Sequence, residues 1–513
     1  MTYLPLVIIL LGIRTALWHL QYWQLREYRF DRIKAYFETQ DGWGNLWNLW
    51  FFRGILPRPT ISGRVLLILF IFAGLSILSI YFFSLISSLF FVVFLLWERT
   101  IFLMIGISVF LSKFPVWIAE KRLYSQAKSI IKNSQNIVRI GITGSYGKSS
   151  TKEILVHLLT SEFGAENVLF NPANQNNEIA IARLILKNRN FFSNRKLEIA
   201  NRKFLVCEMG AYRVGEIRKV CDFLQPHIGI LTGLNAQHIS LFGSQENIQK
   251  AKFELAENSS DKVFFNADNQ FLNQIFTDKK IRASKIPLSL QSVKNITALL
   301  DRTEFELYGQ KTVLPWAGEF FVGNALLAAE VAREVGISPK NITSFLSKLP
   351  PLSRALSVHT LPSGALLMKD LYSANPDGVL CAIEHLKKGK GKKVFVSLPL
   401  LELGNTASLV HQQIFEALRD IQAEVFWMKR DFSEIGKDIC GARFHGDDVQ
   451  MLQKMIQTLS KNDAVLLESR LPQSVLKIFS GKNLFRIKFL QTLHSVMPSM
   501  PHSRCGASEV GKI

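Results

Sequence analysis

The sequence predicts two α/β domains, of which the second is Rossmann-like, preceded by an α-helical transmembrane region. Three observations support this fold class. Long uncharged apolar stretches are concentrated before residue 113, and a glycine-rich turn follows a β-branched run at 137–143. Apolar strand-like runs then alternate with helical stretches, as expected for parallel sheets covered by helices. With 513 residues, the chain is long enough for about three or four domains.

The N-terminal region has the composition of membrane helices. Val65 to Trp97 carry no formal charge, and a second uncharged run lies between Arg99 and Lys113. Because a bilayer core requires about 20 apolar residues per helix, two spans are expected near 65–86 and 88–112. Residues 3–22 provide a third apolar run. It competes with a cleaved signal peptide, but no charged segment precedes it and no A-x-A-like site follows it, which favours a retained helix.

The charge of the flanking segments predicts the topology. Residues 21–64 carry seven Lys or Arg, which the positive-inside rule places in the cytoplasm. Three spans then put the N-terminus outside and everything after residue 112 inside. The sequence therefore predicts a multi-pass protein of the cell membrane with cytoplasmic α/β domains. Glu98 and Arg99 interrupt the third span and must pair or face the helix bundle.

The formal net charge of +20 is consistent with a membrane surface. Several basic residues follow the last span and suit anionic lipid headgroups. Nucleic acid is the alternative partner, and we do not expect it because no recognition motif accompanies the charge. The five cysteines include no C-x-x-C pair, so neither a zinc site nor a disulfide framework is indicated. The basic residues are Lys113, Lys121, Arg122, Lys128 and Lys132.

The glycine-rich turn after residue 143 predicts a phosphate-binding loop, or P-loop. Backbone N–H groups and the helix dipole suit a phosphate chain, Lys148 suits its terminal phosphates, and the Ser149 hydroxyl suits Mg²⁺. ATP and Mg²⁺ are the expected cofactors. Ile142 stands where the strict G-x-x-x-x-G-K-[ST] pattern has its first glycine, so an ordinary strand-to-helix loop is the alternative. The predicted nucleotide-binding residues are Gly144, Ser145, Tyr146, Gly147, Lys148, Ser149 and Ser150.

The alternation of strands and helices divides the rest of the chain. Strands are expected at 137–143, 203–209, 228–232 and 262–265, and again at 364–369, 393–398, 423–428 and 464–468. Ligands of parallel sheets gather beyond the carboxyl ends of the strands, where Glu208, His238 and Asp370 lie. The expected domains are a transmembrane region at 1–124, a central P-loop domain at 125–345, a C-terminal α/β domain at 346–488 and a loose tail at 489–513.

Six blocks of residues carry a resemblance to the Mur ligase family. Within that family the sequence is most similar to the MurF-like branch, which joins D-alanyl-D-alanine to a UDP-N-acetylmuramoyl tripeptide. The similarity covers about two-thirds of the chain. The blocks are Gly141-Ile-Thr-Gly-Ser-Tyr-Gly-Lys-Ser-Ser; Asn174-Gln-Asn-Asn-Glu-Ile; Glu208-Met-Gly-Ala with Gly215-Glu-Ile; His238 with Phe242-Gly-Ser and Lys252; Asn324-Ala-Leu-Leu-Ala-Ala; and Asp370-Leu-Tyr-Ser-Ala-Asn-Pro with Leu401-Glu-Leu-Gly.

The resemblance implies a role for each of these residues. ATP would phosphorylate a carboxylate, and an amine would attack the acyl phosphate, so charge neutralisation is the main requirement. Lys148 would neutralise phosphates, while Ser149 and Glu208 would hold Mg²⁺. By the same resemblance, His238 and a carbamylated Lys252 serve a second Mg²⁺, Asn324 contacts adenine, Arg354 contacts the nucleotide, and Asp370 closes over ATP. The implied substrate contacts are Asn174, Asn176, Asn177, Tyr372 and Asn375.

Structural roles are the alternatives for these residues. A glutamate at a strand end can be a capping or salt-bridged group, and a histidine can be a satisfied structural residue. A lysine in a helical run is usually solvated. The asparagines at 174, 176 and 177 could cap a turn.

The sequence also departs from the family pattern. Phe320 and Phe321 occupy places where His-Asn is usual, which puts adenine binding in doubt. Leu467-Glu468-Ser469 replaces a Lys-Gly-Ser motif and adds a negative charge where the incoming dipeptide would be recognised. Membrane helices precede the loop in place of a UDP-binding domain.

These observations predict a membrane-anchored, ATP-dependent amide ligase of Mur type, acting on a small-molecule or lipid-linked peptide precursor in peptidoglycan synthesis. A polyglutamate-synthase-like membrane ligase is the nearest alternative, because it shares the Gly-Lys-Ser-Ser form of the loop. A non-catalytic or transport-coupled P-loop membrane protein is a further alternative, although the Asn, His and Lys blocks would then have no use. The sequence leaves both substrates and the oligomeric state open.

Overall fold

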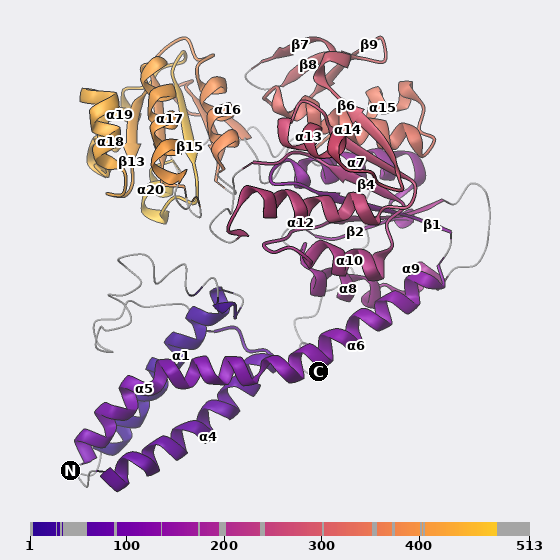
Figure 1. The fold of residues 1–513 in the computed structure, drawn as a ribbon. Coiled ribbons are helices and arrows are strands. Elements are labelled where there is room, and N and C mark those ends of the chain that lie inside the picture. The colour runs from indigo at the N-terminus through magenta and orange to yellow at the C-terminus, as the bar shows by residue number, and fades with distance from the viewer. Residues whose placement is uncertain are drawn as a thin grey trace. The chain divides into compact units, whose positions relative to one another are not determined.

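We describe the fold from a computed structural model. It describes residues 4–479 except 27, 31–32, 34–58, 87–89, 135, 173–174, 194–201, 236–241, 300–301, 351–356, 372–374, 401–402 and 404–405. The chain divides between Leu123 and Tyr124 into two compact units. The first consists of helices, and the second contains two α/β domains (Figure 1).

The N-terminal unit packs around an aromatic core. Leu20 and Trp23 of α1 are buried against residues of α4 and α5, and Trp97 lies directly on Gly12 of α1. The other face of α4 is apolar and exposed, which suits lipid rather than water. The helices are α1 Leu4–Leu25, α4 Gly63–Ile86, α5 Phe90–Leu111 and α6 Lys113–Lys132. Exposed side chains of α4 include Leu66, Phe70, Ile77, Leu78, Phe82 and Leu85.

Two helical stretches among the described residues are long and apolar enough to cross a membrane. They are Gly63–Leu85 and Val92–Lys132, judged by length and composition alone. Helices α4 and α5 therefore lie where the second and third spans were expected. Helix α1 covers the first expected span but is not among these candidates, so the three-span topology stays a prediction.

A six-stranded parallel sheet forms the middle domain, in the order β2-β3-β1-β4-β5-β6. A small antiparallel sheet, β7-β8-β9, adjoins it in the sequence. The strands are β1 Ile137–Thr143, β2 Val168–Phe170, β3 Lys203–Glu208, β4 Ile228–Leu231, β5 Lys262–Asn266, β6 Ser284–Leu288, β7 Lys294–Ala298, β8 Thr303–Leu307 and β9 Gln310–Leu314. The helices are α7 Lys148–Phe163, α8 Glu178–Lys187, α9 Arg189–Ser193, α10 Glu216–Leu224, α12 Gln245–Asn258, α13 Gln270–Asp278, α14 Phe320–Glu334 and α15 Pro339–Leu346.

The two faces of strand β1 explain how the middle domain is layered. Ile140 and Ile142 point into the core shared with α7 and α14. Gly141 faces the opposite side, where an added Cβ would lie 2.7 Å from Leu255 of α12. Side chains alternate along a strand, so β1 contacts helices on both faces of the sheet. Helices therefore cover both faces, and the loops at the carboxyl edge of the sheet remain free to form a site.

The C-terminal domain has a second six-stranded sheet, in the order β10-β11-β15-β12-β13-β14. All neighbouring pairs are parallel except β10 with β11. Helices cover both faces, as in a Rossmann-like domain. The strands are β10 Ser357–Thr360, β11 Leu366–Asp370, β12 Lys393–Ser397, β13 Glu424–Trp427, β14 Phe444–Gly446 and β15 Ala464–Glu468. The helices are α16 Pro376–Leu386, α17 Ala407–Asp420, α18 Ser433–Cys440, α19 Val449–Gln457 and α20 Gln473–Ile478.

Candidate active site

The loop between β1 and α7 has the backbone that a phosphate cradle requires. Gly144 and Gly147 have φ values of 154° and 76°, and an added Cβ at Gly144 would lie 2.2 Å from Thr232 Oγ1. Only glycine fits such positions without strain. The Ser145 N–H donates to the Gly233 carbonyl at 2.7 Å, which fixes the loop to the end of the neighbouring strand β4.

Lys148 lies at the mouth of helix α7, as predicted. Its Nζ donates to the carbonyl oxygens of Gly144 and Ser145, at 2.7 and 2.9 Å. Burial lowers its pKa, and the nearby Glu208 carboxylate opposes that shift. Tyr146 belongs to the same loop, and its hydroxyl accepts a hydrogen bond from Asn269 at 3.2 Å. The loop is thus held by contacts on both sides.

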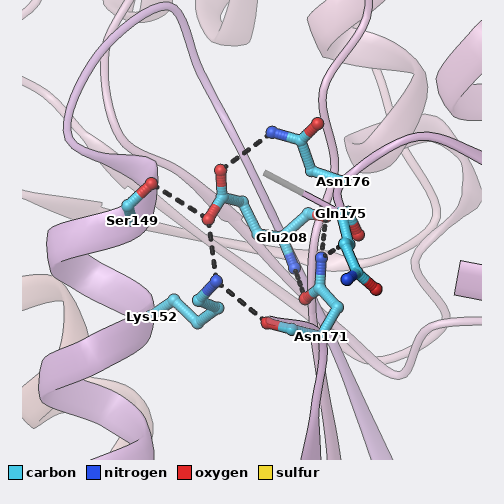
Figure 2. A network of polar contacts seen from close by, with 6 residues as sticks. All are labelled: Ser149, Lys152, Asn171, Gln175, Asn176 and Glu208. Carbon is cyan, nitrogen blue, oxygen red and sulfur yellow. Dashed lines mark hydrogen bonds and ion pairs between the residues drawn. The ribbon is translucent and has the colours of Figure 1, made fainter. Parts of the chain in front are cut away.

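Glu208 is the centre of a polar network at the carboxyl end of β3 (Figure 2). Its Oε2 accepts hydrogen bonds from the Ser149 hydroxyl and from Lys152 Nζ, both at 3.0 Å, while Oε1 accepts one from Asn176 at 3.0 Å. Asn171 fixes the backbone of Glu208, accepting from its N–H at 2.8 Å and donating to its carbonyl at 3.0 Å. The bonds from Ser149 and Lys152 hold the carboxylate against the start of α7.

These contacts keep Glu208 ionised although it is only 3% exposed. Burial acts to raise its pKa, but Lys152, Lys148 and the Asn176 hydrogen bond outweigh burial, and the pKa is lowered. The carboxylate is therefore available as a metal ligand at neutral pH.

The spacing of Ser149 and Glu208 fits Mg²⁺. Adjacent oxygen ligands of octahedral Mg²⁺ lie about 3.0 Å apart, given metal–oxygen distances of about 2.1 Å. Ser149 Oγ and Glu208 Oε2 are 3.0 Å apart. The described residues contain no group of three or more His, Cys, Asp or Glu side chains that could hold a metal ion. A Mg²⁺ ion here would need further ligands from phosphate oxygens and water.

Asn324, the predicted adenine contact, lies beside the loop. A Cβ on Gly147 would be 2.6 Å from its Oδ1, and its side chain is buried on helix α14. The preceding aromatic residues have structural roles. Phe321 is buried in the middle-domain core, and Phe320 packs against it with ring centroids 4.1 Å apart and ring planes tilted by 40°.

Comparison with known proteins is consistent with this geometry. Residues 142–332 match the family model described as the Mur ligase middle domain. The UDP-N-acetylmuramoyl-tripeptide--D-alanyl-D-alanine ligase of Haemophilus influenzae is 23% identical over 371 residues, covering 70% of this chain and 76% of the relative. The enzyme of the same name from Mycobacterium bovis is 30% identical over 299 residues. The match covers 55% of that relative, so the chain spans about half of the relative's length. It covers 54% of this chain.

Residues 142–332 of this chain therefore correspond to a Mur ligase middle domain. Solved structures agree on the Mur ligase fold. The crystal structure of MurF from Acinetobacter baumannii has a TM-score of 0.61 at 22% identity, covering 70% of this chain and 80% of that one. MurF from Thermotoga maritima in complex with ADP has a TM-score of 0.57 at 23% identity, covering 70% and 83%. The predicted family and fold class are confirmed.

Lys252, which the Mur ligase resemblance singles out for carbamylation, is buried on α12 and only 4% exposed. Its Nζ donates to the Ala211 carbonyl at 3.2 Å and lies 5.8 Å from the centre of the Phe242 ring. Burial, assisted by repulsion from Lys148, lowers its pKa to about 7. A large share of this amine is neutral at physiological pH, and the neutral form is the one that reacts with CO₂. This environment suits a carbamate, whose formation stays a prediction.

Two of the three predicted asparagines near position 175 are described, and they have different roles. Asn176 binds the Glu208 carboxylate and so belongs to the site. Asn177 caps helix α8 by accepting a hydrogen bond from the Ala180 N–H at 2.9 Å, the structural role considered as its alternative. Asn174 lies outside the described residues, as do His238, Arg354 and Tyr372.

Asp370 and Asn375 are the C-terminal candidates that the structure describes. Asp370 ends β11 and lies opposite Glu468 in register. Asn375 caps α16 by accepting from the Gly378 N–H at 3.0 Å, and Asn235 of the middle domain donates to its Oδ1 at 3.3 Å. Asn375 thus has a capping role, while its proposed substrate contact stays a prediction.

Two residues of the Glu208 network were not predicted from the sequence. Lys152 is 3% exposed and bridges Glu208 to the Asn171 carbonyl at 3.0 Å. Helical spacing gave one signal: Lys152 lies three residues after Ser149 and four after Lys148, so all three project near one face of α7. Asn171 gave no signal, because its side chain binds the backbone of Glu208, a residue 37 positions away.

Proposed function

We propose that this chain is a membrane-anchored, ATP-dependent amide ligase that joins an amine to the peptide carboxylate of a muramoyl-type cell-wall precursor. One observation carries the proposal. The ionised Glu208 carboxylate, Ser149 and Lys148 meet at a glycine-rich loop that precedes a helix N-terminus. The sequence relatives described above, which are named as ligases of this reaction, support the same substrate class.

The residues of the site suit the activation step. Lys148 is placed to offset the negative charge that develops when a carboxylate oxygen attacks the terminal phosphate of ATP. Bound Mg²⁺ would neutralise the phosphate oxygens, with Ser149 and Glu208 as its protein ligands. Lys152 and Asn176 hold the Glu208 carboxylate in one orientation, which reduces the rearrangement needed when nucleotide binds.

In the second step, an amine must attack the acyl phosphate while water is excluded. The acyl carbon gains the amine nitrogen and loses the phosphate oxygen through a tetrahedral intermediate, and the amine loses a proton. We propose that carbamylated Lys252 serves a second Mg²⁺ near the acyl phosphate. Asp370, at the end of β11, closes the C-terminal domain over the nucleotide in this proposal.

The activation step can be tested separately from the choice of amine. Purified full-length protein in detergent would receive ATP, Mg²⁺, UDP-N-acetylmuramoyl tripeptide and hydroxylamine, which traps an acyl phosphate as a hydroxamate. We expect ATP-dependent hydroxamate from the wild type. Lys148→Ala should lose it, whereas Lys219→Ala, an exposed lysine on α10, serves as the matched control. No hydroxamate from the wild type would contradict the proposed function.

A polyglutamate-synthase-like ligase is the second candidate. The apolar helices α4 and α5, which precede the loop along the chain, favour it. Depletion of the protein in its host distinguishes the two. Accumulation of the tripeptide precursor supports the muramoyl ligase, and an unchanged precursor pool supports polymer synthesis.

We also propose the three-span topology, with the catalytic domains in the cytoplasm. The exposed apolar face of α4 and the basic residues of α6 support this arrangement. Protease added to the outside of intact cells should leave the 21–64 segment uncut. Cleavage within that segment would rule out the topology.

A further inference from the structure

The last residues of three neighbouring strands form a polar row at the carboxyl edge of the C-terminal sheet. Strands β11, β15 and β12 end at Asp370, Glu468 and Ser397. The register places Asp370 beside Glu468 and Ser397 on the other side. Because side chains alternate along a strand, all three point to the face on which Leu466 packs with residues of α16 and α17.

Glu468 is buried in this row without a partner. It is 1% exposed, and neither carboxyl oxygen has a hydrogen-bond partner within the part of the chain that the structure describes. Nor does Glu468 form an ion pair with any residue that the structure describes. The neighbouring Ser397 hydroxyl donates instead to the Leu398 carbonyl, at 2.9 Å. A buried carboxyl group without a partner is unfavourable, and native proteins rarely retain one unless a ligand or a reaction uses it.

We propose that Glu468, in the middle of this row, binds a positively charged group of the amine-bearing substrate. This inference rests on the proposed function and names the class of its second substrate. Ligands of open parallel sheets bind beyond the carboxyl ends of the strands, where this row lies. An ionised Glu468 carboxylate attracts an ammonium group and repels a free carboxylate. The preferred amine therefore carries a positively charged group, in contrast to the terminal carboxylate of D-alanyl-D-alanine.

The nearby Asp370 affects the protonation of Glu468. Burial, together with repulsion from Asp370, raises the pKa of Glu468 well above its ordinary value. A bound ammonium group would favour the ionised form and supply the missing partner. Binding of the cation and loss of the proton from Glu468 are then coupled, so the site takes up its ligand without leaving a charge unpaired.

Three amines separate charge from shape. The full-length protein would be assayed with ATP, UDP-N-acetylmuramoyl tripeptide and, in turn, D-alanyl-D-alanine, the butyl amide of D-alanine and the aminobutyl amide of D-alanine. We expect kcat/KM for the aminobutyl amide to exceed that for the butyl amide by about 30-fold or more, as for a buried charge pair. D-alanyl-D-alanine should be the poorest of the three. Equal use of the two amides, or preference for the dipeptide, would overturn the inference.

Glu468→Gln keeps the shape of the side chain and removes its charge. We expect the preference for the aminobutyl amide to fall below about threefold, since the charge pair is lost. Glu424→Gln is the matched control, because Glu424 begins β13 in the same sheet and pairs with His445 at 2.6 Å. An unchanged preference in Glu468→Gln would contradict the assignment of Glu468.

Hydroxylamine trapping distinguishes failure of this inference from failure of the proposed function. It needs activation of the tripeptide carboxylate but no amine site. Hydroxamate formation without a preference for the cationic amine overturns the inference and leaves the proposed function standing. Absence of hydroxamate from the wild type overturns the proposed function. The wild-type comparison of amines needs no variant, so a failure of Glu468→Gln to fold does not remove the test.

Discussion

Glu208 and Glu468 occupy equivalent places in the two α/β domains but have opposite chemistry. Each ends a strand in the interior of a parallel sheet, and they are 3% and 1% exposed. The pKa of Glu208 is lowered, because Lys152 and Lys148 overcome the effect of burial. The pKa of Glu468 is raised, because burial and Asp370 act in the same direction.

Burial alone therefore does not decide whether a carboxyl group at the edge of a sheet is ionised. The partners supplied by neighbouring elements decide it. At the carboxyl edge of the middle-domain sheet, the cations Lys152 and Lys148 and the amide of Asn176 keep the Glu208 carboxylate ionised. At the carboxyl edge of the C-terminal sheet, no described residue is such a partner for Glu468, and we propose that the substrate supplies it.

The strongest test of this comparison is the stability of two matched variants. Glu208→Gln leaves the Lys152 ammonium buried without an anion, so we expect the free energy of unfolding to fall by about 3–5 kcal/mol. Glu468→Gln removes a carboxyl group that has no partner and should leave the free energy of unfolding unchanged or slightly higher. Denaturant unfolding of both full-length proteins, without ligands, provides the measurement. Equal losses in the two variants would show that the two edges do not differ.

Lys148→Ala tests whether the positive charge of Lys148 contributes to catalysis. Loss of such charge stabilisation typically lowers the rate about 100- to 1,000-fold. The measurement is hydroxamate formation at saturating ATP. Activity within a few-fold of the wild type would remove Lys148 from the mechanism.

Lys252 distinguishes a carbamate from a simple positive charge. Lys252→Ala should lose about 10- to 100-fold in activity and regain part of it with added formate or acetate, because a short carboxylate can replace the carbamate. Lys252→Arg should stay inactive, since a guanidinium does not bind Mg²⁺. Ligation rates with and without the added acid provide the measurement. An active arginine variant would mean that positive charge alone suffices.

The pH dependence of stability gives the smallest but most direct contrast. Glu468 takes up protons on folding, so between its ordinary pKa of 4.5 and its higher folded pKa it lowers the free energy of unfolding as pH rises, by up to about 1.4 kcal/mol per unit. Glu208 contributes stability above pH 4.5 that is lost as pH falls through its lower folded pKa. Thermal unfolding from pH 4 to 8, about the range that proteins tolerate, should show the first slope in the wild type and not in Glu468→Gln. The same slope in both would remove Glu468 as its cause.

The central strands were predictable because they are apolar and continuous. Strands β1, β3, β4 and β5, and likewise β11, β12, β13 and β15, lie where the sequence predicted them. The missed strands are short or polar and lie at edges or in the small antiparallel sheet. Thus β2 and β14 have three residues each, and β10 has the sequence Ser-Val-His-Thr. Pairing with a neighbour defines these strands, and periodicity within one segment does not reveal it.

The candidate site divides in a similar way. Lys148, Ser149 and Glu208 were predictable because a loop motif and a strand end mark them. Lys152 was not, since a lysine within a helix is ordinarily solvated and only the approach of β3 buries it. The capping role of Asn177 could be weighed from the sequence but not separated from a substrate contact.

The hydrogen bonds of Lys148 to its own loop have a consequence for nucleotide recognition. Its ammonium group already binds two carbonyl oxygens, so in the proposed function ATP would exchange partners with the loop rather than fill an open position. A weakly charged anion gains little binding free energy from this exchange, because its contacts with Lys148 only replace those that Lys148 loses with the loop. A polyphosphate gains more, because it also brings several negative charges to the helix N-terminus. The loop in this way discriminates by total charge, and its affinity for nucleotide should weaken as ionic strength rises.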